Sequence, residues 1–241
     1  MSRHLTTTES SHLSSLQRCG VCIMLLATSL FLASSAYADN ISIGLQEPGT
    51  NSGMITTEAT GSGNLTISGV SYGTFTVNDV SAQDFTLLGP PGLLNSQSLD
   101  ISTAKPGVLT IWVTAQGLSF TGVQNFVSSF AVNTLRGSVV GVTENTYFSP
   151  TNALYGGTLL KSAVFSGIGT AGPFTKEGAT IGTYSVTNQY VIFDIGGTEG
   201  NDNITMDLSA TPVPEPASFG LMGIGLAAIA ALSRRRRAIL P

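Results

Sequence analysis

The segment Val108-Leu-Thr-Ile-Trp-Val-Thr-Ala115 decides the fold class, because its side chains alternate in character along the chain. One side of an extended chain carries the apolar residues Leu109, Ile111, Val113 and Ala115. The other side carries Thr110, Trp112 and Thr114. Successive side chains of a strand point to opposite faces, so this segment is predicted to be a strand with one face in a core.

The same period recurs at 74–77, 126–132 and 204–208, whereas 184–195 is apolar on both faces towards its end. A strand of that last kind is expected at the centre of a sheet, with a neighbour on each side. Turn-forming clusters separate the strands at 61–64, 89–92, 105–107, 156–157 and 196–197. The body is therefore predicted to be all-β, an antiparallel β-sandwich or jelly roll, with its strand order left open.

Composition supports this prediction and bears on the partners of the chain. The chain has 241 residues, and the stretch 39–212 is rich in glycine but poor in lysine and arginine. That stretch holds twelve acidic and four basic side chains, so its net charge is near −8. Since a nucleic-acid surface needs clustered positive charge, no nucleic-acid partner is expected.

The histidines and cysteines are confined to the N-terminal end, as His4, His12, Cys19 and Cys22. A mature chain that begins after them has neither an imidazole nor a thiol. This excludes Ser-His-Asp hydrolysis, Cys-His proteolysis, structural zinc and His-ligated metals in the mature protein, and it excludes disulfides.

The N-terminal region has the order of a secretory signal peptide. Arg3 and Arg18 precede the apolar run 21–32, and small residues that include Ala36 and Ala38 follow it. Cleavage by signal peptidase is expected after Ala38, so that 1–38 directs the chain into the general secretion pathway. The alternative is an apolar anchor that remains in the membrane, although the run is short for that role.

Residues 209–212 are predicted to be a short linker between the body and the C-terminal region. The C-terminal region itself consists of three parts in a fixed order. Val213-Pro-Glu-Pro-Ala217 is followed by an uncharged apolar stretch, 217–233, and then by a cluster of arginines. The cluster is Arg234, Arg235, Arg236 and Arg237. A helix over 217–233 is about 25 Å long, close to the lower limit for one transmembrane helix, and the arginines would hold its end in the cytoplasm. The alternative of a buried core helix does not explain the arginines.

This C-terminal order resembles the PEP-CTERM protein-sorting signal of exopolysaccharide-producing Gram-negative bacteria, over residues 213–241. The resemblance implies export, transient retention in the inner membrane and processing by an exosortase, followed by delivery to the cell surface or the exterior. In that scheme the exosortase recognises Pro214, Glu215 and Pro216. The helix 217–233 anchors the chain in the membrane, and the arginines at 234–237 are the retention signal. The chain would then be a substrate of the processing enzyme.

The best candidate for a ligand site in the body is the acidic loop 194–202. Its carboxylates are Asp194, Glu199 and Asp202, and the glycine-rich segments between them offer backbone carbonyl oxygens. Oxygen ligands of this kind suit calcium, so a weak calcium site is one interpretation, and an ordinary solvated hairpin is the other. No other cofactor is expected.

Two short motifs match catalytic patterns by chance. Gly167-Ile-Gly-Thr-Ala-Gly172 fits a nucleotide-binding loop, but Pro173 and further non-helical residues follow it, so a plain loop is predicted. Ser102-Thr-Ala-Lys105 fits the S-x-x-K pattern of penicillin-recognising enzymes, but Pro106-Gly107 prevents the helical turn which that pattern needs.

The carboxylates and aromatic rings of the body leave two other functions open, glycoside hydrolysis and sugar binding. Glycoside hydrolysis needs a spaced carboxylate pair, and the body offers Asp79, Asp84, Asp100, Glu144 and Glu177 in addition to the acids of the loop. Nothing in the sequence pairs them. The aromatic candidates for a sugar platform are Trp112, Tyr147, Phe148, Tyr155, Tyr184 and Tyr190. Most of them are expected in the core, whereas Trp112 is left open because it shares a face with threonines.

Taken together, these patterns predict an exported, non-catalytic surface or matrix protein that associates with exopolysaccharide. The association is implied by the resemblance. A carbohydrate-binding module with a defined sugar site is the first alternative, and a carboxylate-dependent glycan-active enzyme is the second.

Overall fold

A computed structural model describes residues 40–88, 91–197, 200–213 and 222–229. Its strands are β1 (Asn40–Gln46), β2 (Thr56–Gly61), β3 (Asn64–Tyr72), β4 (Phe75–Asp84), β5 (Gly92–Thr103), β6 (Pro106–Gly137), β7 (Val139–Ser149), β8 (Thr158–Phe165), β9 (Gly169–Ile195) and β10 (Gly200–Pro212). Two short helices interrupt them, η1 (Asn51–Gly53) and α2 (Phe85–Leu88). Residues 222–229 are also helical.

All recorded strand pairs are antiparallel, in the order β3-β4-β5-β10-β6-β9-β7-β8. β1 joins this sheet through β6 and carries β2 on its other side. The predicted all-β antiparallel class is therefore confirmed. The strand 184–195 lies between β6 and β7, which is the central position predicted from its apolar faces.

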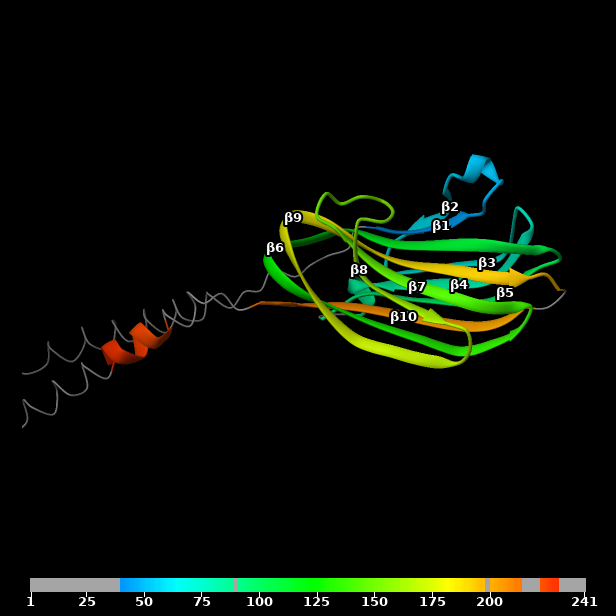
Figure 1. Ribbon diagram of the computed structural model, residues 1–241. Helices are drawn as coiled ribbons and strands as arrows, with labels where there is room; N and C mark the ends of the chain where they lie inside the picture. The colour runs from blue at the N-terminus through cyan, green and yellow to red at the C-terminus, as the bar shows by residue number, and fades with distance from the viewer. Residues whose placement is uncertain (1–39, 89–90, 198–199, 214–221, 230–241) are drawn as a thin grey trace, which may run out of the picture. The chain divides into compact units, whose positions relative to one another are not determined.

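The two long strands β6 and β9 divide the sheet into two packed layers (Figure 1). In the first layer, 106–115 of β6 and 186–195 of β9 pair with each other and lie between β1 and β7. In the second layer, 124–137 of β6 pairs with β10, and β9 from 169 onwards pairs along the other side of β6. The two layers form the sandwich.

The core lies between the layers. Leu109, Ile111, Val113 and Ala115 are all fully buried, as the alternation of their segment predicts. Aromatic rings join the layers, since Phe126 of β6 lies 4.7 Å from Phe148 of β7 between ring centroids. Tyr184 packs edge-on against both rings, at 6.1 and 5.7 Å. Such edge-to-face packing stabilises beyond the area it buries.

Hydrogen bonds also cross the core. Ser96 of β5 lies in the second layer, and its hydroxyl bonds Tyr190 Oη at 2.7 Å and accepts from Asn188 Nδ2 at 2.8 Å. Tyr190 and Asn188 belong to β9 in the first layer. A second bridge joins the hydroxyls of Ser128 and Thr146 at 2.7 Å. These bonds fix how the two layers face each other, because a buried polar group must find a partner.

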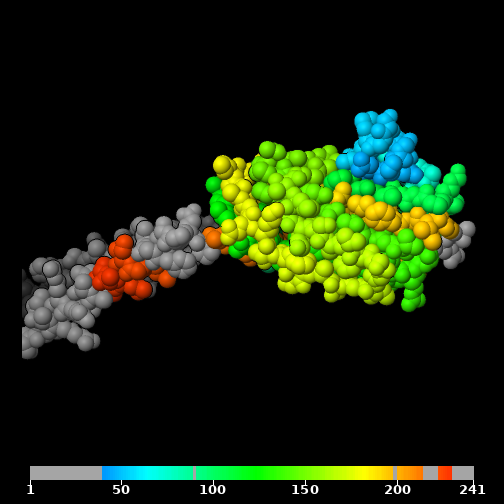
Figure 2. Space-filling view, viewed as in Figure 1, coloured from blue at the N-terminus to red at the C-terminus, as the bar shows by residue number. Residues whose placement is uncertain are grey.

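The open edges of the layers meet along β8 and the first part of β9. Lys161 of β8 places its ammonium group 4.3 Å from the centre of the Phe174 ring. Lys176 of β9 donates to the Leu159 carbonyl at 2.5 Å. Lysines on edge strands oppose pairing with other chains. Figure 2 shows the residues of β7 to β9, in green and yellow, over much of this side of the body.

Two predictions of loop structure are wrong. Residues 169–172 belong to β9, where they pair with β6 around a bulge, because glycine lets the strand continue past the irregular register. Residues 209–212, expected as a linker, belong to β10 and pair with β6, and Ala210 among them is buried. In both places the long partner strand β6 supplies backbone hydrogen bonds that local sequence cannot reveal.

The bridge at Ser96 yields a stability prediction. Ser96→Ala removes the partner of Tyr190 Oη and of Asn188 Nδ2 inside the core, so it should lower the free energy of unfolding by about 1–3 kcal/mol. Ser98→Ala is a matched control on the same strand, because Ser98 is equally buried but its hydroxyl makes no bond between the layers; it lies by the Asp202 carboxyl, whose pKa it lowers. Its loss should be smaller than that of Ser96→Ala. Denaturant unfolding of both variants measures the difference, and equal losses would contradict the bridge.

Candidate functional site

Three aromatic side chains gather on the outer face of the first layer. Trp112 comes from β6, Tyr147 from β7 and Tyr155 from the connection between β7 and β8. The Trp112 ring lies 6.1 Å from Tyr147 and 6.3 Å from Tyr155 between centroids. All three are partly exposed. We call Trp112, Tyr147 and Tyr155 the aromatic cluster.

Amide side chains hold two of these rings. Trp112 Nε1 donates to Gln46 Oε1 at 3.1 Å, and Gln46 Nε2 donates in turn to the Gly53 carbonyl at 2.8 Å. Tyr147 Oη donates to Gln189 Oε1 at 2.9 Å. Gln189 lies on β9 directly between β6 and β7, opposite Trp112 in register. The cluster is therefore fixed by polar groups that border its rings.

Tyr155 is held by a side chain of β2 and lies over β1. Its hydroxyl bonds Thr57 Oγ1 at 2.8 Å, and its ring covers Gly44 of β1. A Cβ atom at Gly44 would lie 2.6 Å from the Tyr155 hydroxyl oxygen, so a larger residue there would displace the Tyr155 ring. Asn152 fastens the same connection, since its Oδ1 accepts from the Gly117 amide at 2.9 Å. The ring is thus positioned before any ligand arrives.

The six aromatic candidates from the sequence divide into two sets. Phe148, Tyr184 and Tyr190 are core residues, as most of the six were expected to be. Tyr147 and Tyr155 lie on the surface face with Trp112, which sequence alternation alone did not reveal for Tyr155. Its connection crosses back over the sheet, and that path depends on contacts with distant strands.

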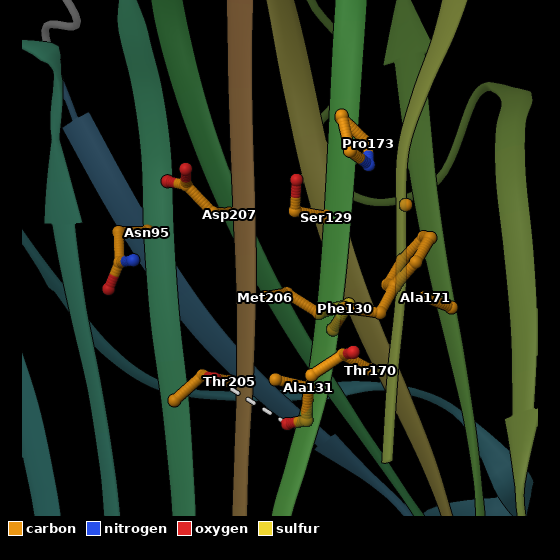
Figure 3. A pocket seen from close by; sticks show the side chains of 11 residues that line it. Asn95, Ser129, Phe130, Ala131, Thr170, Ala171, Pro173, Thr205, Met206 and Asp207 are labelled. Atoms are coloured by element: carbon orange, nitrogen blue, oxygen red, sulfur yellow. Dashed lines mark hydrogen bonds between the residues drawn. The ribbon is translucent and has the colours of Figure 1, made fainter.

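A groove of about 250 Å³ lies on the outer face of the second layer (Figure 3). It is lined by Asn95 of β5, Ser129 of β6, Asp207 of β10 and residues 170–173 of β9, among others. No motif in the sequence marks these residues. The one indication in the sequence is alternation: Asn95 and Asp207 lie next to apolar residues on their strands, which places both side chains on the outer face.

Two carboxyl groups are shut inside the sandwich. Glu144 of β7 is fully buried, neither of its oxygens has a hydrogen-bond partner among the described residues, and burial raises its pKa to about 8. Asp202 is 1% exposed, accepts from the Ile101 amide at 2.6 Å, and has its pKa raised by burial to about 7. Such groups cannot touch an external substrate. A role for Asp202 on a sugar-binding surface is therefore excluded.

Two of the three predicted calcium ligands, Asp194 and Asp202, are engaged separately in the fold. Asp194 accepts from Ser138 Oγ at 3.0 Å and from the Gly196 amide at 2.7 Å, so it serves as a turn cap. Glu199 lies outside the described residues. Within the ranges that the structure describes, no three His, Cys, Asp or Glu side chains gather as metal ligands would. Calcium binding by Asp194, Glu199 and Asp202 stays a prediction.

The other acidic residues named from the sequence lie at separate places in the fold. Asp84 accepts from the Gly63 and Thr86 amides at 2.9 and 2.8 Å and so organises the start of α2. Burial raises the pKa of Asp79, which lies on β4. Glu177 is exposed, and Asp100 raises the pKa of the enclosed Asp202.

The sorting residues fall outside the described part of the chain. This holds for Ala36 and Ala38, for Pro214, Glu215 and Pro216, and for Arg234, Arg235, Arg236 and Arg237. β10 ends at Pro212, and the Val213 amide then donates to the Val123 carbonyl at 2.9 Å. No helix in the described part of the chain is long and apolar enough to cross a membrane. Of the predicted span 217–233, the described portion is helical.

The C-terminal end matches a known sorting signal. The model of the PEP-CTERM protein-sorting motif matches residues 212–237, which confirms the resemblance seen in the sequence. The motif implies export, sorting to the cell surface and processing by an exosortase. The match begins at the last residue of β10. No curated protein matches the chain.

Solved structures show weak similarity to parts of the body. TmCBM61 in complex with beta-1,4-galactotriose has 11% identity and a TM-score of 0.26, covering 56% of this chain and 82% of its own. The C-terminal CBM6 of LamC from Zobellia galactanivorans has 18% identity and a TM-score of 0.22, covering 60% and 98%. Infectious bursal disease virus Gx strain has 13% identity and a TM-score of 0.23, covering 74% and 57%. TM-scores this low support no inference, so the fold description rests on the strand pairing.

The buried glutamate yields a pH prediction. Because the folded-state pKa of Glu144, about 8, lies above its ordinary value of 4.5, its contribution to stability is complete below pH 4.5 and is lost as the pH rises towards 8. Glu144→Gln removes this titration. The stability of the variant relative to the native chain should therefore increase by about 1.4 kcal/mol per pH unit between pH 5 and pH 7.

Denaturant unfolding at several pH values measures this difference. Glu177→Gln makes the same chemical change at an exposed position and is the matched control. If the two variants changed with pH to the same degree, burial of Glu144 would not control the pH dependence.

Proposed function

We propose that this PEP-CTERM-sorted chain is a non-catalytic protein of the cell surface or extracellular matrix that binds exopolysaccharide through the aromatic cluster. The sorting motif at 212–237 supports the destination. The aromatic cluster carries the binding part of the proposal. A sugar ring has apolar C–H faces that pack on aromatic rings, while amide and hydroxyl groups at the border bind its hydroxyls.

The geometry of the aromatic cluster supports this role. The rings of Trp112, Tyr147 and Tyr155 come from separate segments but share one outer face, and their polar atoms are already held by Gln46, Gln189 and Thr57. A ligand therefore meets rings that need not be reoriented, which reduces the entropy lost on binding.

The absence of catalysis is proposed from the side chains of the body. After residue 22 the chain holds no histidine or cysteine. Glu144 and Asp202 are enclosed in the core, and Asp84 and Asp194 accept hydrogen bonds as caps. Turnover of a glycan that disappeared on replacing one Asp or Glu would contradict this part of the proposal.

A module with one defined sugar site is the second candidate, and the fixed positions of the aromatic rings favour it. The two candidates differ in their binding isotherms. Saturable binding of one oligosaccharide that is lost in Trp112→Ala indicates a module at the aromatic cluster, whereas weak and non-saturating attachment to polymer through Trp112 indicates a matrix component.

Trp112→Ala tests the aromatic cluster. The exported protein, purified from its host, should co-sediment with the host's exopolysaccharide, and the variant should bind about tenfold more weakly because the largest ring is lost. Ile181→Ala is the control, since it removes apolar surface that is 90% exposed and lies outside the aromatic cluster. Thermal unfolding checks that both variants are folded. Unchanged binding by Trp112→Ala would rule out the aromatic cluster as the contact.

The sorting motif has its own test. Replacing Pro214, Glu215 and Pro216 together by alanine should abolish processing and leave membrane association intact, because 217–233 and the arginines are unchanged. Mass spectrometry of the surface and membrane fractions measures processing. Thr211→Ala, on β10 just ahead of the motif, is the control and should be processed normally. Normal processing of the triple variant would show that another segment is recognised.

A further inference from the structure

We propose that the groove on the second layer is a separate binding site for one neutral sugar unit, on the face opposite the aromatic cluster. The inference rests on the proposed function for the source of the sugar. The groove holds about 250 Å³, which suits a small ligand or one unit of a longer chain. It draws its lining from β5, β10, β6 and β9.

Three polar side chains form a row across this groove. Asp207 of β10 is directly opposite Asn95 of β5 on one side and Ser129 of β6 on the other. Side chains in register on neighbouring antiparallel strands stand about 5 Å apart. Figure 3 shows Asn95, Asp207 and Ser129 on these strands, with Pro173 beyond Ser129. The row thus presents an amide, a carboxylate and a hydroxyl over about 10 Å, so that one sugar ring can contact two neighbouring members of the row at a time.

The row is distinguished from its neighbours by its hydrogen bonding. On the adjacent part of the same face, Asn203 Oδ1 accepts from Gln97 Nε2 at 3.0 Å and from Asn133 Nδ2 at 3.2 Å. Those side chains satisfy one another. Asn95, Ser129 and Asp207 make no side-chain hydrogen bond to another described residue. Their donors and acceptors are therefore free for a ligand with several hydroxyl groups.

The bulge of β9 builds one wall of the groove. The register between β6 and β9 shifts between Ser128 and Phe130, so Ser129 has no direct partner on β9. Gly172 passes this point with φ +111°, and a Cβ atom there would lie 2.7 Å from the Ser128 carbonyl oxygen. Pro173 follows and, with Ala131 and Ala171, adds apolar surface beside the polar row. A sugar has this combination of hydroxyl edges and an apolar ring face.

Charge identifies the class of sugar. Asp207 is the one charged residue in the lining that the structure describes, and no lysine or arginine contributes to it. A carboxylate accepts hydrogen bonds from neutral hydroxyls but repels uronate, sulfate and phosphate groups. The net charge near −8 of the body acts in the same direction. The ligand is therefore a neutral saccharide.

The experiment uses the exported protein and fragments of the host's own polymer. Partial acid hydrolysis yields oligosaccharides, and anion exchange separates them into neutral and acidic pools. Titration calorimetry is made on Trp112→Ala, in which the aromatic cluster is impaired, and the groove variants are built on that background. It should give saturable binding of the neutral pool and at least tenfold weaker binding of the acidic pool. Asn95→Ala and Ser129→Ala should each weaken neutral binding by about tenfold. Asp207→Asn should bring the acidic pool closer to the neutral one.

Gln97→Ala is the matched control, because Gln97 lies two residues along β5 from Asn95 on the same face. It should bind the neutral pool normally, and thermal unfolding checks that each variant is folded. Preference for the acidic pool, absence of saturable binding, or binding that survives Asn95→Ala and Ser129→Ala would each overturn the inference. If polymer still co-sediments through Trp112 in those cases, the proposed function stands and the groove inference alone fails.

Discussion

The pairing of β6 with β9 is the constraint on which the rest of the structure depends. β6 has 32 residues and β9 has 27, and the two remain paired through both layers of the sandwich. The ladder is interrupted between Ala115 and Leu118 and again between Ser128 and Phe130. Each bulge allows a strand to bend without losing its partner, so one pair of strands can serve two layers.

This pairing also assigns the surfaces of the protein. The first part of β6 presents Trp112 on the outer face of one layer, and its second part presents Ser129 on the outer face of the other. The aromatic cluster and the groove are consequently two sites on one continuous strand. β10 pairs with the second part of β6 up to Pro212, where the sorting motif begins. The fold thus connects the secreted body to its sorting signal without a separate linker.

The interior combines apolar packing with enclosed polar groups. Rings from Phe126, Phe148 and Tyr184 bring the layers together, and hydrogen bonds from Ser96 and Ser128 set their alignment. Glu144 lies among these residues with a pKa of about 8. An enclosed carboxyl favours its neutral form, so the core is most stable where that group remains protonated. The polar groups of the core align the two layers, whereas the groups proposed to bind a ligand lie on the outer faces.

The sequence by itself determined the fold class, the buried face of 108–115, the central place of 184–195 and the sorting motif. These depend on side-chain period and on contiguous residues, which can be read locally. Tertiary structure alone decided the strand order, the extension of β9 back to Gly169, the position of Tyr155 over Gly44 and the burial of Asp202. Each of these depends on a partner far away in the chain. Long-range strand pairing brings such partners together, and no local pattern encodes which strand will be the neighbour.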